Sequence, residues 1–251
     1  MQEKKPHISI IVPVYKCRDA LPELYKRVDE TMTHLGRSYE LIFINDGCPV
    51  NSWHIISDLC NKYSAIKGIN LSRNFGQHIA IEAGLEHAGG EWVVVMDCDL
   101  QDAPEMISSL YRKALSGYDI VLGRRMVRKD NFVKRILSLL FYKLLGYLTG
   151  TKQDPAIANF GIYSRKVVLA ICSMKDYSRY FPAMVRWVGF RSTTISINHE
   201  KRKYGKTSYS PGKLIRLGTD VMIAFSDKPL RLVMKFGLII SFISFLTGLA
   251  Y

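Results

Sequence analysis

The chain has 251 residues, of which 48% are hydrophobic and 23% are charged, and its formal net charge is +13. This length and composition fit one large α/β domain with no disordered tail. The five cysteines, at positions 17, 48, 60, 98 and 172, include no C-x-x-C pair, so we expect neither a disulfide framework nor a zinc site. The reducing cytosol is the expected compartment.

The basic residues gather in two segments of the sequence. Such patches attract phosphate, whether in nucleic acid, an anionic lipid or a phosphorylated substrate. No nucleic-acid-binding motif accompanies them, and the bases lie beside apolar stretches, so we expect no nucleic-acid partner. The two groups are Arg124, Arg125, Arg128, Lys129, Lys134 and Arg135, and Lys201, Arg202, Lys203, Lys206, Lys213 and Arg216.

Alternating strand and helix patterns occupy residues 8–123. Short apolar runs predict the strands, and longer runs with helical spacing predict the helices. Their alternation predicts a doubly wound, mostly parallel sheet with right-handed crossovers. The expected strands are Ile8–Val14, Tyr39–Ile44, Ile66–Leu71, the run that begins at Trp92, and Ile120–Gly123; the expected helices are Leu21–Leu35, Ser52–Tyr63, Asn74–Ala88 and Pro104–Ser116.

The stretch WVVVMDCDLQD, residues 92–102, is a buried-strand pattern that ends in carboxylates. Ligands of open α/β sheets bind beyond the carboxyl ends of strands, and Asp97 and Asp99 are two residues apart, on the same side of an extended chain. Two close carboxylates repel each other unless a cation neutralises them. Their oxygens suit Mg²⁺ or Mn²⁺, which one or two carboxylates often hold together with substrate phosphates. Cys98, between them, is expected to point to the opposite face.

The C-terminal half contains three apolar stretches. Residues 132–148 combine an apolar stripe with flanking bases, which suits either a membrane-interface helix or a helix that faces the core. Pro211–Phe225 has the same amphipathic character. Phe236–Tyr251 is uncharged for sixteen residues, a little short of the ~20 that a membrane span requires, so we expect the chain to stop inside a transmembrane helix.

Short motifs follow one another along the chain: Ile-Val-Pro-Val-Tyr (11–15), Asn-Asp-Gly (45–47), Ser-Arg-Asn-Phe-Gly-Gln-His (72–78), Ala-Gly-Leu (83–85), Met-Asp-Cys-Asp-Leu-Gln-Asp (96–102), Gly-Arg-Arg (123–125) and Arg-x-x-Gly-x-Thr-x-Tyr (202–209). No single motif is decisive, but the ordered set is highly specific. On this set the chain resembles the inverting glycosyltransferases of family 2, which have the GT-A fold. Within them it is similar to the polyprenyl-phosphate glycosyltransferases related to dolichol-phosphate mannose synthase and the bactoprenol glucosyltransferases.

The resemblance implies three parts of the chain. Residues 1–130 would form the nucleotide-sugar-binding GT-A half. Residues 131–228 would form an acceptor-binding part with amphipathic helices at the membrane interface. Residues 229–251 would hold a juxtamembrane segment and the start of the transmembrane helix.

The resemblance also assigns residues to the donor. Pro13, Tyr15 and Asp46 would line the base and ribose of the nucleotide, and Arg73 would lie against its diphosphate. A carboxylate at Asp46 can accept the imide N–H of uracil, which favours a UDP-sugar. A simple turn is the alternative interpretation of residues 45–47, because Asn, Asp and Gly dominate turns.

Asp97 and Asp99 resemble the metal-binding pair of the family, and Gln101 would complete the set of ligands for Mg²⁺ or Mn²⁺. Such an ion acts as a Lewis acid that stabilises the charge growing on the leaving nucleotide, so Asp99 is also counted as catalytic.

Two arginines would clamp phosphate, because a guanidinium fork suits this task better than an ammonium group: either Arg124 or Arg125, together with Arg202. Arg202, like Asp99, is expected to be catalytic, because it would bind the phosphate of the acceptor. Asp154 is the candidate for a general base or an orienting group.

The implied reaction is inverting transfer of a sugar from a nucleotide-diphosphate sugar to undecaprenyl phosphate. A lipid monophosphate is already anionic near neutral pH and attacks without a general base. The expected place is the cytoplasmic face of the cell membrane, with anionic lipid as a partner. The alternative is a GT-A enzyme that adds a sugar to a hydroxyl of a growing glycan and uses its apolar helices for contact within a homo-oligomer. The terminal apolar stretch favours the lipid acceptor.

Overall fold

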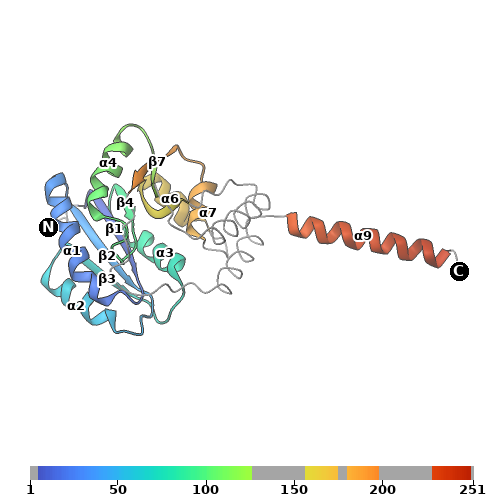
Figure 1. The fold of residues 1–251 in the computed structure, drawn as a ribbon, viewed down its shortest axis with the longest axis horizontal. Helices are drawn as coiled ribbons and strands as arrows, with labels where there is room; N and C mark the ends of the chain where they lie inside the picture. Colours follow the sequence, from blue (N-terminus) through green and yellow to red (C-terminus); the bar gives the residue numbers. More distant parts are fainter. Residues whose placement is uncertain (1–4, 126–155, 175–179, 198–227, 250–251) are drawn as a thin grey trace. The chain divides into compact units, whose positions relative to one another are not determined.

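The computed structural model describes residues 5–125, 156–174, 180–197 and 228–249 (Figure 1). Within this part of the chain a seven-stranded sheet has the order β3-β2-β1-β4-β6-β5-β7. The strands are β1 (Ile8–Val14), β2 (Tyr39–Asn45), β3 (Ile66–Asn70), β4 (Trp92–Val95), β5 (Ile120–Arg125), β6 (Ile157–Ser164) and β7 (Ser192–Ile197).

The sheet is mixed, and a single strand makes it so. β1 pairs in parallel with β2 and β4, β2 pairs in parallel with β3, and β5 pairs in parallel with β7. β6 lies between β4 and β5 and is antiparallel to both. The expectation of a mostly parallel, doubly wound sheet is therefore correct for the half around β1. That expectation did not include β6, a strand from later in the chain (residues 157–164) that lies between β4 and β5.

Helices cover both faces of this sheet (Figure 1). On one face α1 contacts α2 and α4, and on the other face α3, α6 and α7 contact one another. The result is a three-layer α/β/α arrangement. The helices of this arrangement, with two short 3-10 turns, are η1 (Arg18–Ala20), α1 (Leu21–Leu35), α2 (Ser52–Lys62), α3 (Gln77–His87), η2 (Pro104–Met106), α4 (Ile107–Leu115), α6 (Arg165–Ser173) and α7 (Phe181–Trp187).

The burial of β1 in the core explains why its sequence is an almost continuous apolar run. All seven of its residues are buried, because helices cover both faces. Alternate residues Ile8, Ile10 and Val12 pack with α1 and α4 in one cluster. On the other face α3 approaches closely, since a Cβ at Gly84 would lie 2.5 Å from Ile11 Cγ2 and therefore could not fit.

The chain divides into two compact units: Met1–Lys129 with Ala156–Thr207, and Asp130–Pro155 with Ser208–Tyr251. The predicted division at residues 130 and 228 differs from this partition. The reason is that β6 and β7, which follow residue 130 in the sequence, pair with β4 and β5.

The second unit contains α9 (Lys228–Leu249), a helix of 22 residues. Its large apolar side chains are exposed, from Leu230 to Leu249. Among the residues that the structure describes, none forms a helix with both the length and the hydropathy needed to cross a bilayer. The predicted transmembrane segment is therefore not confirmed, and the predicted helices at 132–148 and 211–225 lie outside the described residues.

Glu40 ties three strands together at the edge of the sheet where β1 begins. Its side chain is buried, and its Oε1 accepts hydrogen bonds from Ser9 Oγ at 2.5 Å and from Gly89 N at 2.6 Å. Lys67 Nζ lies 2.8 Å from the other carboxylate oxygen. Burial by itself would raise the pKa of Glu40, but the bonds from Lys67, Ser9 and Gly89 together hold it below its ordinary value.

We predict that Glu40→Gln lowers the free energy of unfolding by about 2 kcal/mol at pH 7, because a buried acceptor of charge-assisted bonds is lost. Because the folded state lowers the pKa of Glu40, its stabilisation is complete above the ordinary value of 4.5 and is lost as the pH falls through the lowered pKa. Urea unfolding of wild type and Glu40→Gln from pH 7 down to about pH 3 measures how this difference in the free energy of unfolding changes with pH.

Glu30→Gln is the matched control, since Glu30 is exposed. Its ion pair with Lys26 is long, at 3.9 Å, and an exposed pair of this kind contributes little to stability. It should change the stability little at any pH. A difference between wild type and Glu40→Gln that persists unchanged at low pH would show that packing, and not charge, is the contribution of Glu40.

Candidate active site

The ends of three strands bring the predicted site residues to one edge of the sheet. β1 pairs in parallel with β2 up to Val14 and Asn45, and with β4 up to Ile11 and Val95. Tyr15, Asp46 and Asp97 follow these strand ends. The sheet therefore places loops with polar side chains side by side, where open α/β sheets bind ligands.

Asp46 is the best-defined polar residue of this edge. It is buried, and its two carboxylate oxygens accept the backbone N–H groups of Phe75 and Gly76 at 2.7 and 3.0 Å. Asn74 Nδ2 donates to the carbonyl oxygen of Asp46 at 3.1 Å. Burial raises the pKa of Asp46 and outweighs the two backbone hydrogen bonds, which lower it. Asp46 thus holds the loop before α3.

Gly47 allows that loop to come close. Its φ is +54°, and a Cβ at this position would lie 2.3 Å from the backbone nitrogen of Asn74. Residues 45–47 are therefore more than a simple turn, because the approach of the second loop requires glycine. The same contact shortens α3, which begins at Gln77 and not at the predicted Asn74, since residues 74–76 bind Asp46 instead of entering the helix.

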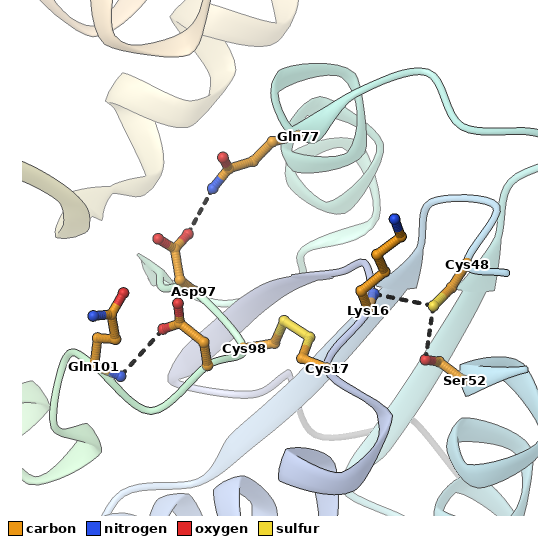
Figure 2. Close-up of a disulfide and its surroundings, with 9 residues drawn as sticks. Lys16, Cys17, Cys48, Ser52, Gln77, Asp97, Cys98 and Gln101 are labelled. Atoms are coloured by element: carbon orange, nitrogen blue, oxygen red, sulfur yellow. Dashed lines mark hydrogen bonds between the residues drawn. A yellow bond between two sulfur atoms is a disulfide. The ribbon is translucent and has the colours of Figure 1, made fainter. Parts of the chain in front are cut away.

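Asp97 receives a hydrogen bond that the sequence did not reveal. Gln77 Nε2, in the first turn of α3, donates to Asp97 Oδ1 at 2.6 Å (Figure 2). Asp99 is largely buried, and its Oδ1 accepts the backbone N–H of Gln101 at 3.1 Å. Gln77 belongs to the motif at 72–78, but nothing in the spacing of that motif indicates a partner twenty residues away.

The arginines have different surroundings. Arg73 is exposed, and its guanidinium lies 4.3 Å from the centroid of the Phe75 ring. Arg124 is exposed at the end of β5. Arg125 Nη2 is 3.4 Å from Asp102 Oδ2, and Asp102 is almost fully buried. Arg125 therefore fastens the loop after β4 to β5, a role beyond the phosphate clamp predicted for it.

The remaining predicted residues are placed as follows. Pro13 is buried within β1, opposite Ile44 of β2. Tyr15 is partly exposed, and Lys16 Nζ lies 5.2 Å from the centroid of its ring. Asp154 and Arg202 lie outside the described residues.

The carboxylates at 97 and 99 fit a hard divalent cation in their donor chemistry. Across the described segments, no group of three or more His, Cys, Asp or Glu side chains could hold a metal by itself. Two carboxylates suffice for Mg²⁺ or Mn²⁺ when substrate phosphates supply further oxygens. The hydrogen bond from Gln77 orients Asp97, as groups that hold metal ligands commonly do.

One prediction about the cysteines is wrong. Cys17 and Cys98 form a disulfide, with their Cα atoms 6.2 Å apart, although no disulfide was expected (Figure 2). The spacing of the cysteines carried no signal of this bond, because the two residues are 81 positions apart and meet only through the pairing of β1 with β4. Cys98 belongs to the buried hydrophobic cluster.

The strand order, the polar edge and the paired carboxylates define an α/β enzyme with a GT-A-like sheet. The chain belongs to the family described as glycosyl transferase family 2, whose model matches residues 9–171. The expectation drawn from the ordered motifs is thereby confirmed, and the protein is a glycosyltransferase.

Two relatives match nearly the whole chain. An uncharacterized glycosyltransferase of Synechocystis sp. is 37% identical over 238 residues, which cover 94% of this chain and 75% of the relative. The undecaprenyl-phosphate 4-deoxy-4-formamido-L-arabinose transferase of Klebsiella pneumoniae is 33% identical over 243 residues, which cover 96% of this chain and 74% of the relative. The second relative places the chain near enzymes of the polyprenyl-phosphate subgroup.

Solved structures share the fold. Glucosyl-3-phosphoglycerate synthase from Mycobacterium tuberculosis, in complex with Mn²⁺, UDP and glucosyl-3-phosphoglycerate, has a TM-score of 0.61 at 14% identity and covers 86% of this chain and 77% of its own. A mannosyltransferase from Pyrobaculum calidifontis, in complex with GDP-Man and Mn²⁺, has a TM-score of 0.52 at 15% identity over 80% of this chain and 59% of its own.

We predict that Asp46→Asn loosens the loop before α3. Asparagine has one acceptor oxygen where aspartate has two, so at least one of the N–H groups of Phe75 and Gly76 loses its partner, at a cost of about 1–3 kcal/mol. Hydrogen exchange should show faster exchange at residues 75–76. Asp58→Asn, an exposed aspartate on α2, is the control and should leave that exchange unchanged. Equal protection in wild type and Asp46→Asn would contradict this role of Asp46.

Proposed function

We propose that this glycosyltransferase transfers a sugar, with inversion, from a UDP-sugar to a polyprenyl phosphate, undecaprenyl phosphate, at the cytoplasmic face of the cell membrane. The observation that carries the proposal is the 33% identity, over 96% of this chain, to a relative named for an undecaprenyl-phosphate sugar transferase. The polar edge of the sheet supplies the chemistry.

The donor is proposed to bind at the ends of β1 and β2. Pro13 and Tyr15 would flank the base, and Asp46 would meet the uracil or ribose through the lone pairs that its two backbone bonds leave available. Arg73 would lie beside the diphosphate, since it is exposed on the loop that Asp46 holds. These roles are supported by the meeting of the two loops at Gly47.

Asp97, Asp99 and Gln101 are the proposed ligands of Mg²⁺ or Mn²⁺. When bound, this ion would neutralise the diphosphate and stabilise the leaving nucleotide as a Lewis acid. The contribution of the chain is to hold the ligands ready: Gln77 orients Asp97, and the backbone N–H of Gln101 orients Asp99. Solved structures that share the fold contain Mn²⁺ together with UDP, which supports the proposal.

The acceptor phosphate is proposed to be bound by Arg124 and Arg202, while Arg125 holds the loop of Asp102. An oxygen of the anionic lipid phosphate attacks the anomeric carbon, the bond from that carbon to the donor diphosphate breaks, and UDP leaves. No proton has to be removed from the attacking oxygen, so the reaction requires no general base. Asp154 keeps its proposed role as an orienting group.

The membrane is the proposed partner of α9. Apolar side chains are exposed along the whole helix, and its basic residues lie near its start, at Lys228, Arg231 and Lys235. This distribution suits a lipid surface, with bases at the headgroups and apolar side chains against the acyl chains. A polyprenyl acceptor keeps its tail in that bilayer, so an enzyme held at the surface meets the phosphate.

The decisive experiment incubates the full chain with Mn²⁺, undecaprenyl phosphate and a panel of UDP-sugars, followed by organic extraction. The expected result is sugar label in the organic phase with one of the donors and release of UDP. A parallel incubation replaces undecaprenyl phosphate with a glycan; transfer only to the glycan, with label in the aqueous phase, would replace the lipid acceptor with the alternative reaction.

We predict that Asp99→Ala lowers the rate of transfer more than a hundredfold. Loss of a metal ligand removes about 3 kcal/mol of transition-state charge stabilisation. The rate should be measured with added Mn²⁺ and again with EDTA, which should abolish wild-type transfer. Full activity of Asp99→Ala in EDTA would overturn the metal assignment.

Two further variants accompany that measurement. Gln77→Ala should weaken Mn²⁺ binding in the presence of UDP by about 10–100-fold, because Asp97 loses its orienting hydrogen bond. Asp58→Ala, an exposed carboxylate on α2, should behave as wild type. Calorimetry of Mn²⁺ binding separates a loss of metal from a loss of fold.

We predict that the protein sediments with anionic liposomes and less with neutral ones, and that added salt weakens the binding. Ile239→Glu with Ile243→Glu, one turn apart on α9, should release the protein because charges would enter the acyl region. Leu115→Glu with Leu169→Glu is the matched control, since these leucines are also exposed but lie on α4 and α6. If only the control variant, Leu115→Glu with Leu169→Glu, lost binding to the liposomes, the membrane contact would have to lie outside α9.

A further inference from the structure

The Cys17–Cys98 disulfide joins the two loops that carry the proposed donor and metal residues. Cys17 comes two residues after Tyr15, and Cys98 lies between Asp97 and Asp99 (Figure 2). Both cysteines are buried, with exposed fractions of 4% and 8%. The bond therefore lies directly beneath the polar edge of the sheet.

The bond lies where the strand pairing has stopped. The ladder between β1 and β4 ends at Ile11 and Val95, and just beyond it Met96 N donates a hydrogen bond to Ile11 O at 3.1 Å. Past this point the disulfide is a covalent connection between the two loops. The disulfide therefore constrains the mutual position of the two loops, in addition to the hydrogen bonds from Gln77 to Asp97 and from Gln101 N to Asp99.

The backbone on either side of the bond is in an uncommon conformation. Lys16 precedes Cys17 with a φ of +59°, and Leu100 follows Cys98 and Asp99 with a φ of +60°. Residues other than glycine adopt this left-handed region at a cost, so surrounding contacts must hold them there. Removal of a covalent contact beside both residues would let the two loops relax.

A third cysteine lies against the same loop. Cys48 Sγ accepts hydrogen bonds from Lys16 N at 3.1 Å and from Ser52 Oγ at 3.0 Å (Figure 2). Burial by itself would raise the pKa of the Cys48 thiol, but these hydrogen bonds lower it. A thiol with a lowered pKa next to a disulfide loop is chemically suited to thiol–disulfide exchange.

We propose that the Cys17–Cys98 pair is a thiol–disulfide switch that sets the affinity of this glycosyltransferase for its nucleotide and metal. This inference rests on the proposed donor site. The disulfide form holds the loops as the structure shows them and binds the donor tightly, whereas the dithiol form binds it weakly. A disulfide in an enzyme at the cytoplasmic face fits a redox sensor, since cytosolic disulfides are mainly catalytic or redox-sensing.

The interconversion is a two-electron exchange with a small dithiol. One thiolate of the dithiol attacks a sulfur of the Cys17–Cys98 bond and forms a mixed disulfide, and the other cysteine leaves as a thiolate that takes a proton. The second thiol of the reagent then closes its own disulfide and releases the remaining cysteine. The protein gains two electrons and two protons, and the dithiol loses them.

The first measurement determines which sulfurs are bonded. The full chain is oxidised with oxidised glutathione or reduced with a phosphine that is then removed, and free thiols are alkylated before peptide mass spectrometry. We expect a Cys17–Cys98 peptide after oxidation, with Cys48, Cys60 and Cys172 alkylated. Free Cys17 and Cys98 after oxidation, or a Cys17–Cys48 bond in their place, would overturn the proposal.

The second measurement is calorimetry of UDP with Mn²⁺ on both forms. The disulfide form should bind about five- to tenfold more tightly, within the usual range for coupled sites. By the same linkage, saturating UDP and Mn²⁺ should make the disulfide harder to reduce by an equal factor. Equal or weaker binding by the disulfide form overturns the switch.

Two cysteine variants, together with the binding of UDP to each form, distinguish a failure of the switch from a failure of the proposed donor site. Cys17→Ser should bind like the reduced wild type in either redox state, while Cys172→Ser, a cysteine on α6, should keep the full redox response. Circular dichroism verifies that Cys17→Ser is folded, and the comparison of the two wild-type forms does not depend on it. If UDP binds to neither form, the proposed donor site fails and the switch with it. If UDP binds equally to both forms, only the switch fails.

Discussion

The parallel pairing of β1 with both β2 and β4 is the constraint on which the rest of the molecule depends. Because three neighbouring strands run in the same direction, their carboxyl ends deliver Tyr15, Asp46 and Asp97 to one edge. The strands are buried on both faces, so the helices that cover them leave this edge as the place where polar side chains gather. The proposed donor and metal residues Tyr15, Asp46 and Asp97 lie there.

The polar residues of the edge hold the loops as well as the proposed substrates. Asp46 accepts two backbone N–H groups, Gln77 donates to Asp97, and Arg125 lies against Asp102. Burial of a carboxylate costs free energy unless the carboxylate is hydrogen-bonded. These contacts therefore reduce the cost of burying the charged groups before any ligand is present. A site organised in this way loses little freedom when the donor binds.

The proposed acceptor explains the distribution of charge and apolar surface. A phosphate needs cationic contacts and no general base, which agrees with a chain that has 35 lysines and arginines against 22 acidic residues. A polyprenyl tail needs a bilayer nearby, which agrees with the exposed apolar side chains of α9. Both features are what the proposed use of a lipid phosphate as nucleophile requires.

The sequence by itself determined the N-terminal half of the sheet and most of the edge. Strands such as β1 and β2 were predictable because apolar runs report burial, and the position of Asp97 just beyond a strand was predictable because the apolar run of β4 ends at Val95. Only the tertiary structure decided the place of β6, the bond from Gln77 to Asp97 and the disulfide of Cys17 with Cys98. These depend on contacts between residues far apart in the chain, and local periodicity carries no information about which distant segments will meet.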